Sequence, residues 1–262
     1  MKTSRELKWM ARKALSGNYG NAAGGLLVLA LISFLLMIPF VIVIFITSLI
    51  GESAHVGTST AVLAMMVMVI VYMLAGLVLM AGYVRLCYRI VTEGNADLND
   101  LFFAVKHHFT RYLKLTLLLT LCYVLAYLPV MAVFFLLTFS GPKNGGVSTF
   151  FILGYLIYFL GLVLAMLFML RYAMALFVLV EDPELKAREA MRRSRYLMQG
   201  NIWRMIRLQL SFFGVWLLGN ISGGIGYLWV MPYVLCTNAL FYLTLKEEKY
   251  PQAEEQSFGR TD

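Results

Sequence analysis

Two small groups of ionisable side chains could do chemistry in this sequence. Glu181, Asp182 and Glu184 form an acidic cluster, and a cluster of this kind can hold a divalent cation. His107 and His108 are adjacent, so on a helix they would point about 100° apart, poorly placed to share a metal ion. We interpret the acidic group as a solvated helix start, with the divalent cation as the alternative. We therefore expect no metal site, no cofactor and no catalytic residue.

The rest of the sequence gives little sign of catalysis. It contains no P-loop, no HExxH and no GxSxG motif. The long apolar runs contain no Asp, Glu, Lys, Arg or His, so proton relays and carboxylate ion sites have no candidate in them. The three cysteines, Cys87, Cys122 and Cys236, form no CxxC pair, and we interpret them as small apolar side chains.

The apolar runs predict an all-α membrane protein. Apolar residues make up 61% of the 262 residues, more than a soluble core requires. Uncharged runs of membrane-spanning length cover 22–50, 60–84, 115–140 and 147–170. The run 208–245 is too long for one helix and is divided by the turn-forming residues 220–224, which predicts two short helices. We therefore expect six transmembrane helices arranged as three hairpins.

The positive charges predict the orientation. Of the 22 Lys and Arg residues, only Lys143 lies in a short turn between paired spans, and the others lie in the segments before, between and after the hairpins. Because cytoplasmic segments are enriched in Lys and Arg, both termini should be cytoplasmic. We expect a six-helix domain over residues 1–245 and a cytoplasmic polar tail over 246–262. The same asymmetry explains the net charge of +8, so nucleic-acid binding is not expected.

A weak internal repeat divides the chain into three units, at about 3–84, 95–170 and 182–245. An offset of 183 residues aligns Arg5-Glu6, Arg12 and Gly17-Asn18 with Arg188-Glu189, Arg195 and Gly200-Asn201. An offset of 90 aligns Pro39 with Pro129 and several apolar positions. Coincidence within a biased composition is the alternative. Each unit would contain a polar amphipathic helix on the cytoplasmic face followed by a transmembrane hairpin.

The polar helices have recognisable ends. Thr3 with Glu6 has the spacing of a capping box, Asp97 with Asp100 resembles one, and Asp182-Pro183 would start the third helix.

We expect the same kind of turn at the two places where a polar helix meets the span that follows it. Gly17 and Gly200 would end their helices in the left-handed conformation, and Asn18 and Asn201 would cap the spans that follow.

One face of the first and third polar helices is basic. We expect these residues to contact anionic lipid headgroups, while the opposite apolar face lies in the membrane interface or docks on the protein; both can hold at once. The candidate lipid-binding residues are Arg5, Lys8, Arg12, Arg188, Arg192, Arg193 and Arg195.

Four segments together resemble domain-of-unknown-function family 975. They are AREAMRRSRYLMQG at 187–200, LSFFGVWLLG at 210–219, GIGYLWVMPY at 224–233, and ARKALSGNY at 11–19. The resemblance implies a protein of the bacterial cytoplasmic membrane, distantly similar to the membrane region of some glycerophosphodiester phosphodiesterases. It implies no catalytic residues.

Three classes of function are compatible with these features. We favour a non-enzymatic membrane factor that interacts with anionic lipids or with partner membrane proteins. The alternative is a permease or transporter component for a small or amphipathic solute, which would need a polar cavity between spans. A membrane-embedded enzyme is third, because it lacks an acid, base or metal set.

Overall fold

The computed structural model describes residues 2–50, 55–106, 109–139 and 149–250, and every regular element in these ranges is helical. His107, His108, Glu52 and the predicted turn 141–146 lie outside the described residues. The elements are α1 (Ser4–Leu15), α2 (Tyr19–Ile50), α3 (His55–Glu93), η1 (Leu98–Phe102), α4 (Phe103–Lys106), α5 (Phe109–Phe139), α6 (Thr149–Leu170), α7 (Ala175–Glu181), α8 (Ala187–Met198), α9 (Ile202–Leu210), α10 (Phe213–Ile221) and α11 (Tyr227–Lys249).

Five helical segments in the described ranges are long and apolar enough to cross a membrane. The chain is therefore a membrane protein. The segments are Tyr19–Ile46, Met66–Glu93, Phe109–Leu136, Ile152–Glu181 and Tyr227–Lys249. Several of them continue beyond the uncharged runs of the sequence, so their ends carry ionisable residues such as Arg89 and Glu181.

The predicted span that begins at residue 208 is not one continuous helix. It is divided between α9 and α10, each nine residues long, which meet at Ser211 and Phe212. The Ser211 hydroxyl donates to the Leu208 carbonyl (2.6 Å), a local bond that competes with the regular helical pattern. The Lys8 ammonium donates to the Ser211 carbonyl (2.6 Å). Polar contacts therefore stabilise the break between α9 and α10. As a result, the described residues give five candidate spans, whereas the sequence predicted six.

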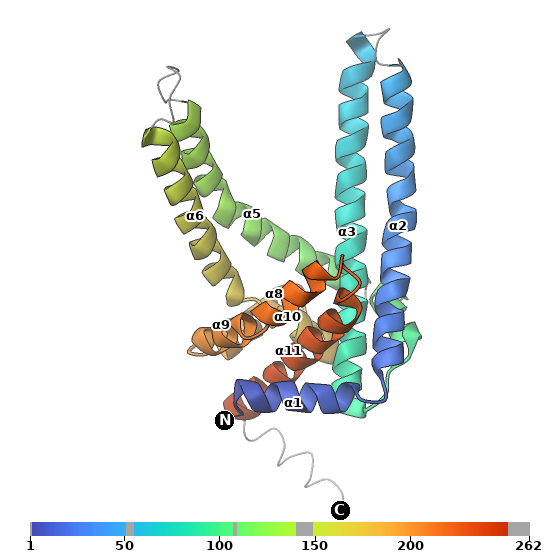
Figure 1. Cartoon of the computed structure of the whole chain (residues 1–262), viewed down its shortest axis with the longest axis vertical. Coiled ribbons are helices and arrows are strands. Elements are labelled where there is room, and N and C mark those ends of the chain that lie inside the picture. The colour runs from blue at the N-terminus through green and yellow to red at the C-terminus, as the bar shows by residue number, and fades with distance from the viewer. Residues whose placement is uncertain (1, 51–54, 107–108, 140–148, 251–262) are drawn as a thin grey trace, which may run out of the picture.

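Two pairs of long helices rise from a common base (Figure 1). The α2/α3 pair stands upright, and the α5/α6 pair leans away from it, while α9 and α10 run across the lower part of the molecule. Helix α1 lies across the foot of α2 and α3. An ion pair between Lys2 and Glu247 (3.2 Å) joins the start of α1 to the end of α11. We call the end that holds α1, α8 and the last turn of α11 the basic end.

The buried core lies toward the basic end. Helix α11 is its centre, packed against α1, α2 and α3. The Cys236 thiol of α11 donates to the Cys87 carbonyl of α3 (3.7 Å), and both cysteines are buried and free, as small apolar side chains would be. The upper parts of the paired helices expose large apolar side chains, as expected for surfaces that face lipid. Packing therefore holds the base together, while much of the surface of the long helices is exposed and apolar.

Helix α11 continues past the predicted boundary of the polar tail. It ends at Lys249, so the first four residues assigned to the tail are helical. Three of them form ion pairs with the rest of the protein. Lys246 contacts Glu181 (2.6 Å), Glu247 contacts Lys2 as described above, and Glu248 forms a bidentate ion pair with Arg204 of α9 (2.7 and 3.2 Å). Residues 251–262 lie outside the described residues.

A glycine in α3 lets the second polar segment pack directly on the helix backbone. A Cβ atom at Gly82 would lie 1.8 Å from the Leu101 carbonyl oxygen of η1, which is far below any allowed contact. Leu101 itself is fully buried. Only glycine therefore permits this approach of η1 to α3.

This close approach predicts different effects for two glycines of the same helix. Gly82→Ala should lower the thermal unfolding temperature of the detergent-solubilised protein by many degrees, because backbone must move. Gly76→Ala is the matched control, since nothing lies within 4 Å of its Cβ position. The control should be neutral or raise the midpoint, because alanine is the better helix former by roughly 0.8–1 kcal/mol. Equal midpoints for the two variants would contradict the packing of η1 on α3.

Candidate functional site at the basic end

Two glycines end α1 and α8 in the same way. Gly17 has φ of 98° and Gly200 has φ of 82°, so both adopt the left-handed conformation predicted from the sequence. Both helices are twelve residues long, and the residue just after each donates its amide to two carbonyls of the last turn. The turns direct the chain from α1 into α2 and from α8 into α9.

The two asparagines after these glycines do not cap the following helices, contrary to the prediction. The Asn18 amide nitrogen donates to the carbonyls of Ala14 (3.4 Å) and Gly94 (2.7 Å), and that of Asn201 donates to the Leu197 carbonyl (3.2 Å). The Asn201 side-chain oxygen accepts instead from the Arg204 guanidinium (2.9 Å). Both asparagines therefore satisfy carbonyls of the preceding helix.

The predicted helix starts have mixed outcomes. The Thr3 and Glu6 capping box is present, with the Thr3 amide donating to the Glu6 carboxylate (2.8 Å) and the Glu6 amide to the Thr3 hydroxyl (3.3 Å). The Asp97 amide donates to the Asp100 carboxylate (3.2 Å) as predicted. The start at Asp182-Pro183 is wrong: these residues form a turn, and α8 begins at Ala187.

The apolar faces of α1 and α8 pack on the protein. Leu7, Ala11 and Leu15 of α1 are buried, as are Ala190 and Met198 of α8. Of the two possibilities that the sequence left open for these faces, docking on the protein is the one seen in the structure. The face left outward on each helix is the basic one.

The seven candidate lipid-binding residues fall into two groups. Lys8 turns toward the protein, with its ammonium on the Ser211 carbonyl and over the Phe212 ring (4.3 Å from the centroid). Burial lowers the pKa of the Lys8 ammonium, and the nearby Arg12 guanidinium lowers that pKa further. Arg193 forms ion pairs with Glu189 (3.1 Å) and Asp182 (4.0 Å). Arg12 is exposed, but its guanidinium lies over the Tyr233 ring (5.3 Å from the centroid). The outward-facing, exposed residues are Arg5, Arg188, Arg192 and Arg195.

Glu181 connects three helices. It is the last residue of α7. Its carboxylate accepts hydrogen bonds from the Tyr88 hydroxyl of α3 (3.1 Å) and, from α11, from the Lys246 ammonium (2.6 Å) and the Tyr242 hydroxyl. The sequence placed this residue in a solvated cluster, because its donors lie 61 to 93 positions away along the chain. Its carboxylate instead holds helices together by charge-assisted hydrogen bonds.

A polar pocket of about 550 Å³ lies beside Glu181. Its charged lining comprises Glu181, Asp182, Arg193 and Lys246, from α7, α8, α11 and the turn after α7. Each of these groups contacts one of opposite charge. The arrangement accounts for the packing of α7, α8 and α11 around the pocket.

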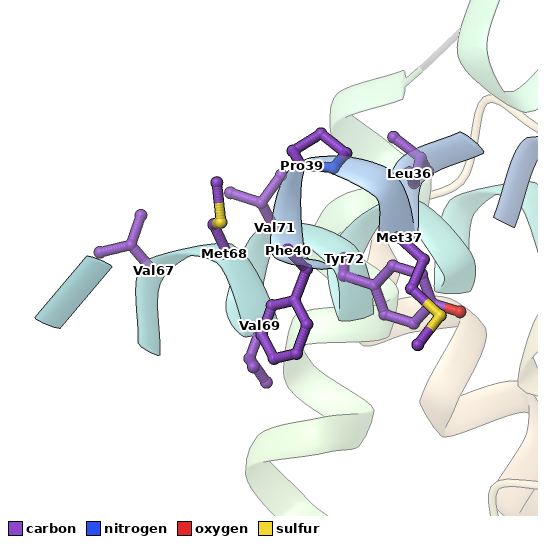
Figure 2. Close-up of a pocket in the computed structure, with 9 residues that line it drawn as sticks. All are labelled: Leu36, Met37, Pro39, Phe40, Val67, Met68, Val69, Val71 and Tyr72. Carbon is purple, nitrogen blue, oxygen red and sulfur yellow. The ribbon is translucent and has the colours of Figure 1, made fainter. Parts of the chain in front are cut away.

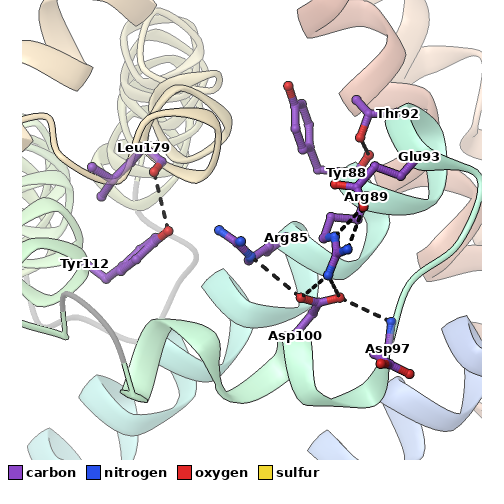
Figure 3. Close-up of polar contacts among 9 residues, drawn as sticks. All are labelled: Arg85, Tyr88, Arg89, Thr92, Glu93, Asp97, Asp100, Tyr112 and Leu179. Atoms are coloured by element: carbon purple, nitrogen blue, oxygen red, sulfur yellow. Dashed lines mark hydrogen bonds and ion pairs between the residues drawn. The ribbon is translucent and has the colours of Figure 1, made fainter.

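Asp100 is the second carboxylate that organises this end of the molecule (Figure 3). It is 6% exposed and accepts two hydrogen bonds from the Arg89 guanidinium of α3 (2.8 and 2.9 Å). Arg85 lies 3.8 Å from the same carboxylate and stacks on the Phe103 ring (3.3 Å to the centroid). These contacts attach η1 and α4 to α3, next to Gly82.

Away from the basic end, the described helices present apolar surfaces. Pro39 lies inside α2 and Pro129 inside α5. Pro39 borders a cavity of about 330 Å³ between α2 and α3, whose lining is apolar except for the Tyr72 hydroxyl (Figure 2). Such a lining suits acyl chains. Among the described residues, no group of three His, Cys, Asp or Glu side chains is placed to hold a metal ion.

Residues 1–249 match the family described as "Protein of unknown function (DUF975)". The chain belongs to this family. The match covers nearly the whole chain and agrees with the resemblance seen at both ends of the sequence. Searches of curated proteins and of solved structures found no match. The family match does not include the phosphodiesterases, so the expected similarity to their membrane region stays a prediction.

The Glu181 contacts predict a measurable loss of stability. Glu181→Gln keeps the size of the side chain but removes its charge, so the bonds from Lys246, Tyr88 and Tyr242 weaken. We expect a loss of about 1–2 kcal/mol after allowing for solvent screening, measured by denaturation in detergent. Glu247→Gln is the control, because its ion pair with Lys2 is exposed and should contribute little. If both variants are equally stable, Glu181 does not hold the helices together.

Proposed function

We propose that the chain is a non-enzymatic membrane factor whose basic end binds anionic lipid headgroups. The observation that carries this proposal is the orientation of α1 and α8. Their apolar faces are covered by the protein, whereas Arg5 of α1 and Arg188, Arg192 and Arg195 of α8 are exposed. An exposed basic face beside apolar spans is attracted to anionic lipid by about 1 kcal/mol for each residue near the surface.

Exposed tryptophans support the same placement. Trp9 of α1 is 62% exposed and Trp203 of α9 is 73% exposed. Tryptophan is enriched where membrane meets water, because one part of the ring system is apolar and its N–H is polar. Both side chains would therefore lie at headgroup depth, beside the outward arginines.

The proposal also covers topology. The Lys2 and Glu247 ion pair brings the start of α1 and the end of α11 to one side of the molecule. With Lys and Arg concentrated at that end, it would face the cytoplasm of a bacterial cell. The α2/α3 and α5/α6 pairs would cross the membrane, while α9, α10 and α11 would enter from the basic end and return to it.

A threefold repeat of a polar helix followed by a helix pair is part of the proposal. The support comes from the corresponding turns at Gly17 and Gly200, and from the asparagine after each, which bonds the carbonyl four residues earlier. In the second unit α5 begins 90 residues after α2, and Pro129 of α5 corresponds to Pro39 of α2. The permease alternative would require a polar path between the helix pairs, and the apolar cavity at Pro39, which lies within the α2/α3 pair, supplies none.

Topology can be tested with fused reporters. Reporters placed after Lys114, Arg207 or Lys246 should report the cytoplasm, and reporters within 51–59 or 141–149 should report the outside. The expectation follows from the distribution of Lys and Arg. One reporter on the opposite side would overturn the proposed orientation.

Lipid preference can be tested in the intact protein. Replacing Arg5, Arg12, Arg192 and Arg195 together with Gln should reduce the enrichment of phosphatidylglycerol over phosphatidylethanolamine in co-purified lipid by about threefold or more at low salt. Replacing the same four residues with Lys keeps the charge and should preserve the enrichment. Unchanged enrichment in the Gln variant, or equal losses in both variants, would contradict the proposal.

A further inference from the structure

A second pocket at the basic end, between α5 and the start of α8, combines charge with an apolar wall. Its volume is about 620 Å³. Four basic side chains line it, with Glu184 as its one acidic member, and three leucines and Ala187 complete its lining. The basic residues are Arg111, Lys114, Lys186 and Arg188, and the leucines are Leu117, Leu118 and Leu121.

The charged and apolar parts of the pocket are separated along the axis of α5. Arg111 and Lys114 lie near the start of the helix, whereas Leu118 and Leu121 follow on the same face at helical spacing. From Lys114 to Leu121 the helix rises about 10 Å toward the membrane-crossing part. The pocket therefore has cations at one end and hydrocarbon at the other, which matches the two parts of a phospholipid.

Arg111 positions the other wall of the pocket. Its guanidinium donates to the Pro183 carbonyl (2.6 Å) and to the Glu184 carboxylate (2.8 Å), which fastens the turn before α8 onto α5. This contact brings Lys186 and Arg188 to the same pocket as Lys114. The charge of Glu184 is thus paired with that of Arg111, and the four cations of the lining outnumber this one carboxylate.

The other three cations keep their charge available. Lys114, Lys186 and Arg188 are exposed, and none of them forms an ion pair with a carboxylate in the part of the chain that the structure describes. Three converging cations without a carboxylate partner favour a group that carries negative charge on several oxygens, such as a phosphate diester. The first turn of α8, which begins at Ala187 in the pocket wall, adds positive potential.

We infer that this pocket holds one anionic phospholipid, with its phosphate on Lys114, Lys186 and Arg188 and an acyl chain along Leu117, Leu118 and Leu121. This inference rests on the proposed function, because it needs the basic end to lie at headgroup depth. It goes further by assigning a defined site for a single lipid, distinct from the diffuse attraction of Arg5, Arg192 and Arg195, which lie outside the pocket. The leucine wall favours a lipid over a free phosphate ion.

The test compares two triple variants of the full-length protein by native mass spectrometry in a neutral detergent, titrated with phosphatidylglycerol. Lys114→Gln, Lys186→Gln and Arg188→Gln together should weaken binding of the first lipid by about tenfold or more. The matched control, Lys13→Gln, Lys106→Gln and Lys249→Gln, removes as many charges from residues outside both the pocket and the candidate lipid-binding group. It should bind the first lipid within about twofold of the parent protein.

Two further arms separate the sources of the phosphate and guard against misfolding. Leu117→Trp changes no charge but fills the apolar half, and it should also weaken binding of the first lipid, whereas inorganic phosphate should not displace that lipid. If inorganic phosphate displaces the lipid, or if Leu117→Trp binds the first lipid normally, the pocket is an anion site and the proposal of a lipid site is wrong. Equal losses in both triple variants, or no loss in the pocket variant, would overturn the pocket. The proposed function is tested separately, by the lipid enrichment of the Arg5, Arg12, Arg192 and Arg195 variant.

Discussion

The carboxylate of Glu181 is the contact on which the arrangement of the basic end depends. It accepts bonds from α3 and from α11, so three helices distant in sequence meet at one residue. The chain then turns through Asp182 into α8, whose position follows from where α7 ends. The polar pocket at Glu181 and the basic pocket on α5 lie on either side of this turn. A charge that would be costly alone near the membrane is stabilised here by three donors.

Local chemistry explains what could be predicted from the sequence. The left-handed turns at Gly17 and Gly200 and the capping box at Thr3 depend on a few neighbouring residues, and the structure contains them. The break at Ser211 could not be foreseen, because its carbonyl is bonded by Lys8, about 200 positions earlier in the chain. For the same reason the sequence offered no donors for Glu181. The segment AREAMRRSRY at 187–196 is helical, as its spacing predicted, and its apolar side packs on the protein.

The basic residues of this end serve two different purposes. Some donate hydrogen bonds to carbonyls and carboxylates inside the protein and so hold α1, η1 and α9 in place. These are Lys8, Arg89 and Arg204. Others, such as Arg192, which is 81% exposed in its side chain, contribute charge to the surface. Counting positive charges in the sequence cannot separate these roles, because every Lys and Arg contributes equally to a topology signal. Only the three-dimensional partners decide which charges remain for a ligand.

The lean of the α5/α6 pair away from α2/α3 has a mechanical meaning (Figure 1). The pairs share a packed base, while the most apolar 18-residue stretch of Phe109–Leu136 contains no buried residue. A bilayer that becomes thicker or thinner can therefore be matched by changing the tilt of one pair, without unpacking the core. Because α5 also forms a wall of the basic pocket, that tilt would move Lys114 relative to Lys186. If α5 crosses the membrane as proposed, membrane thickness would thereby be linked to the shape of the basic pocket at the start of α5.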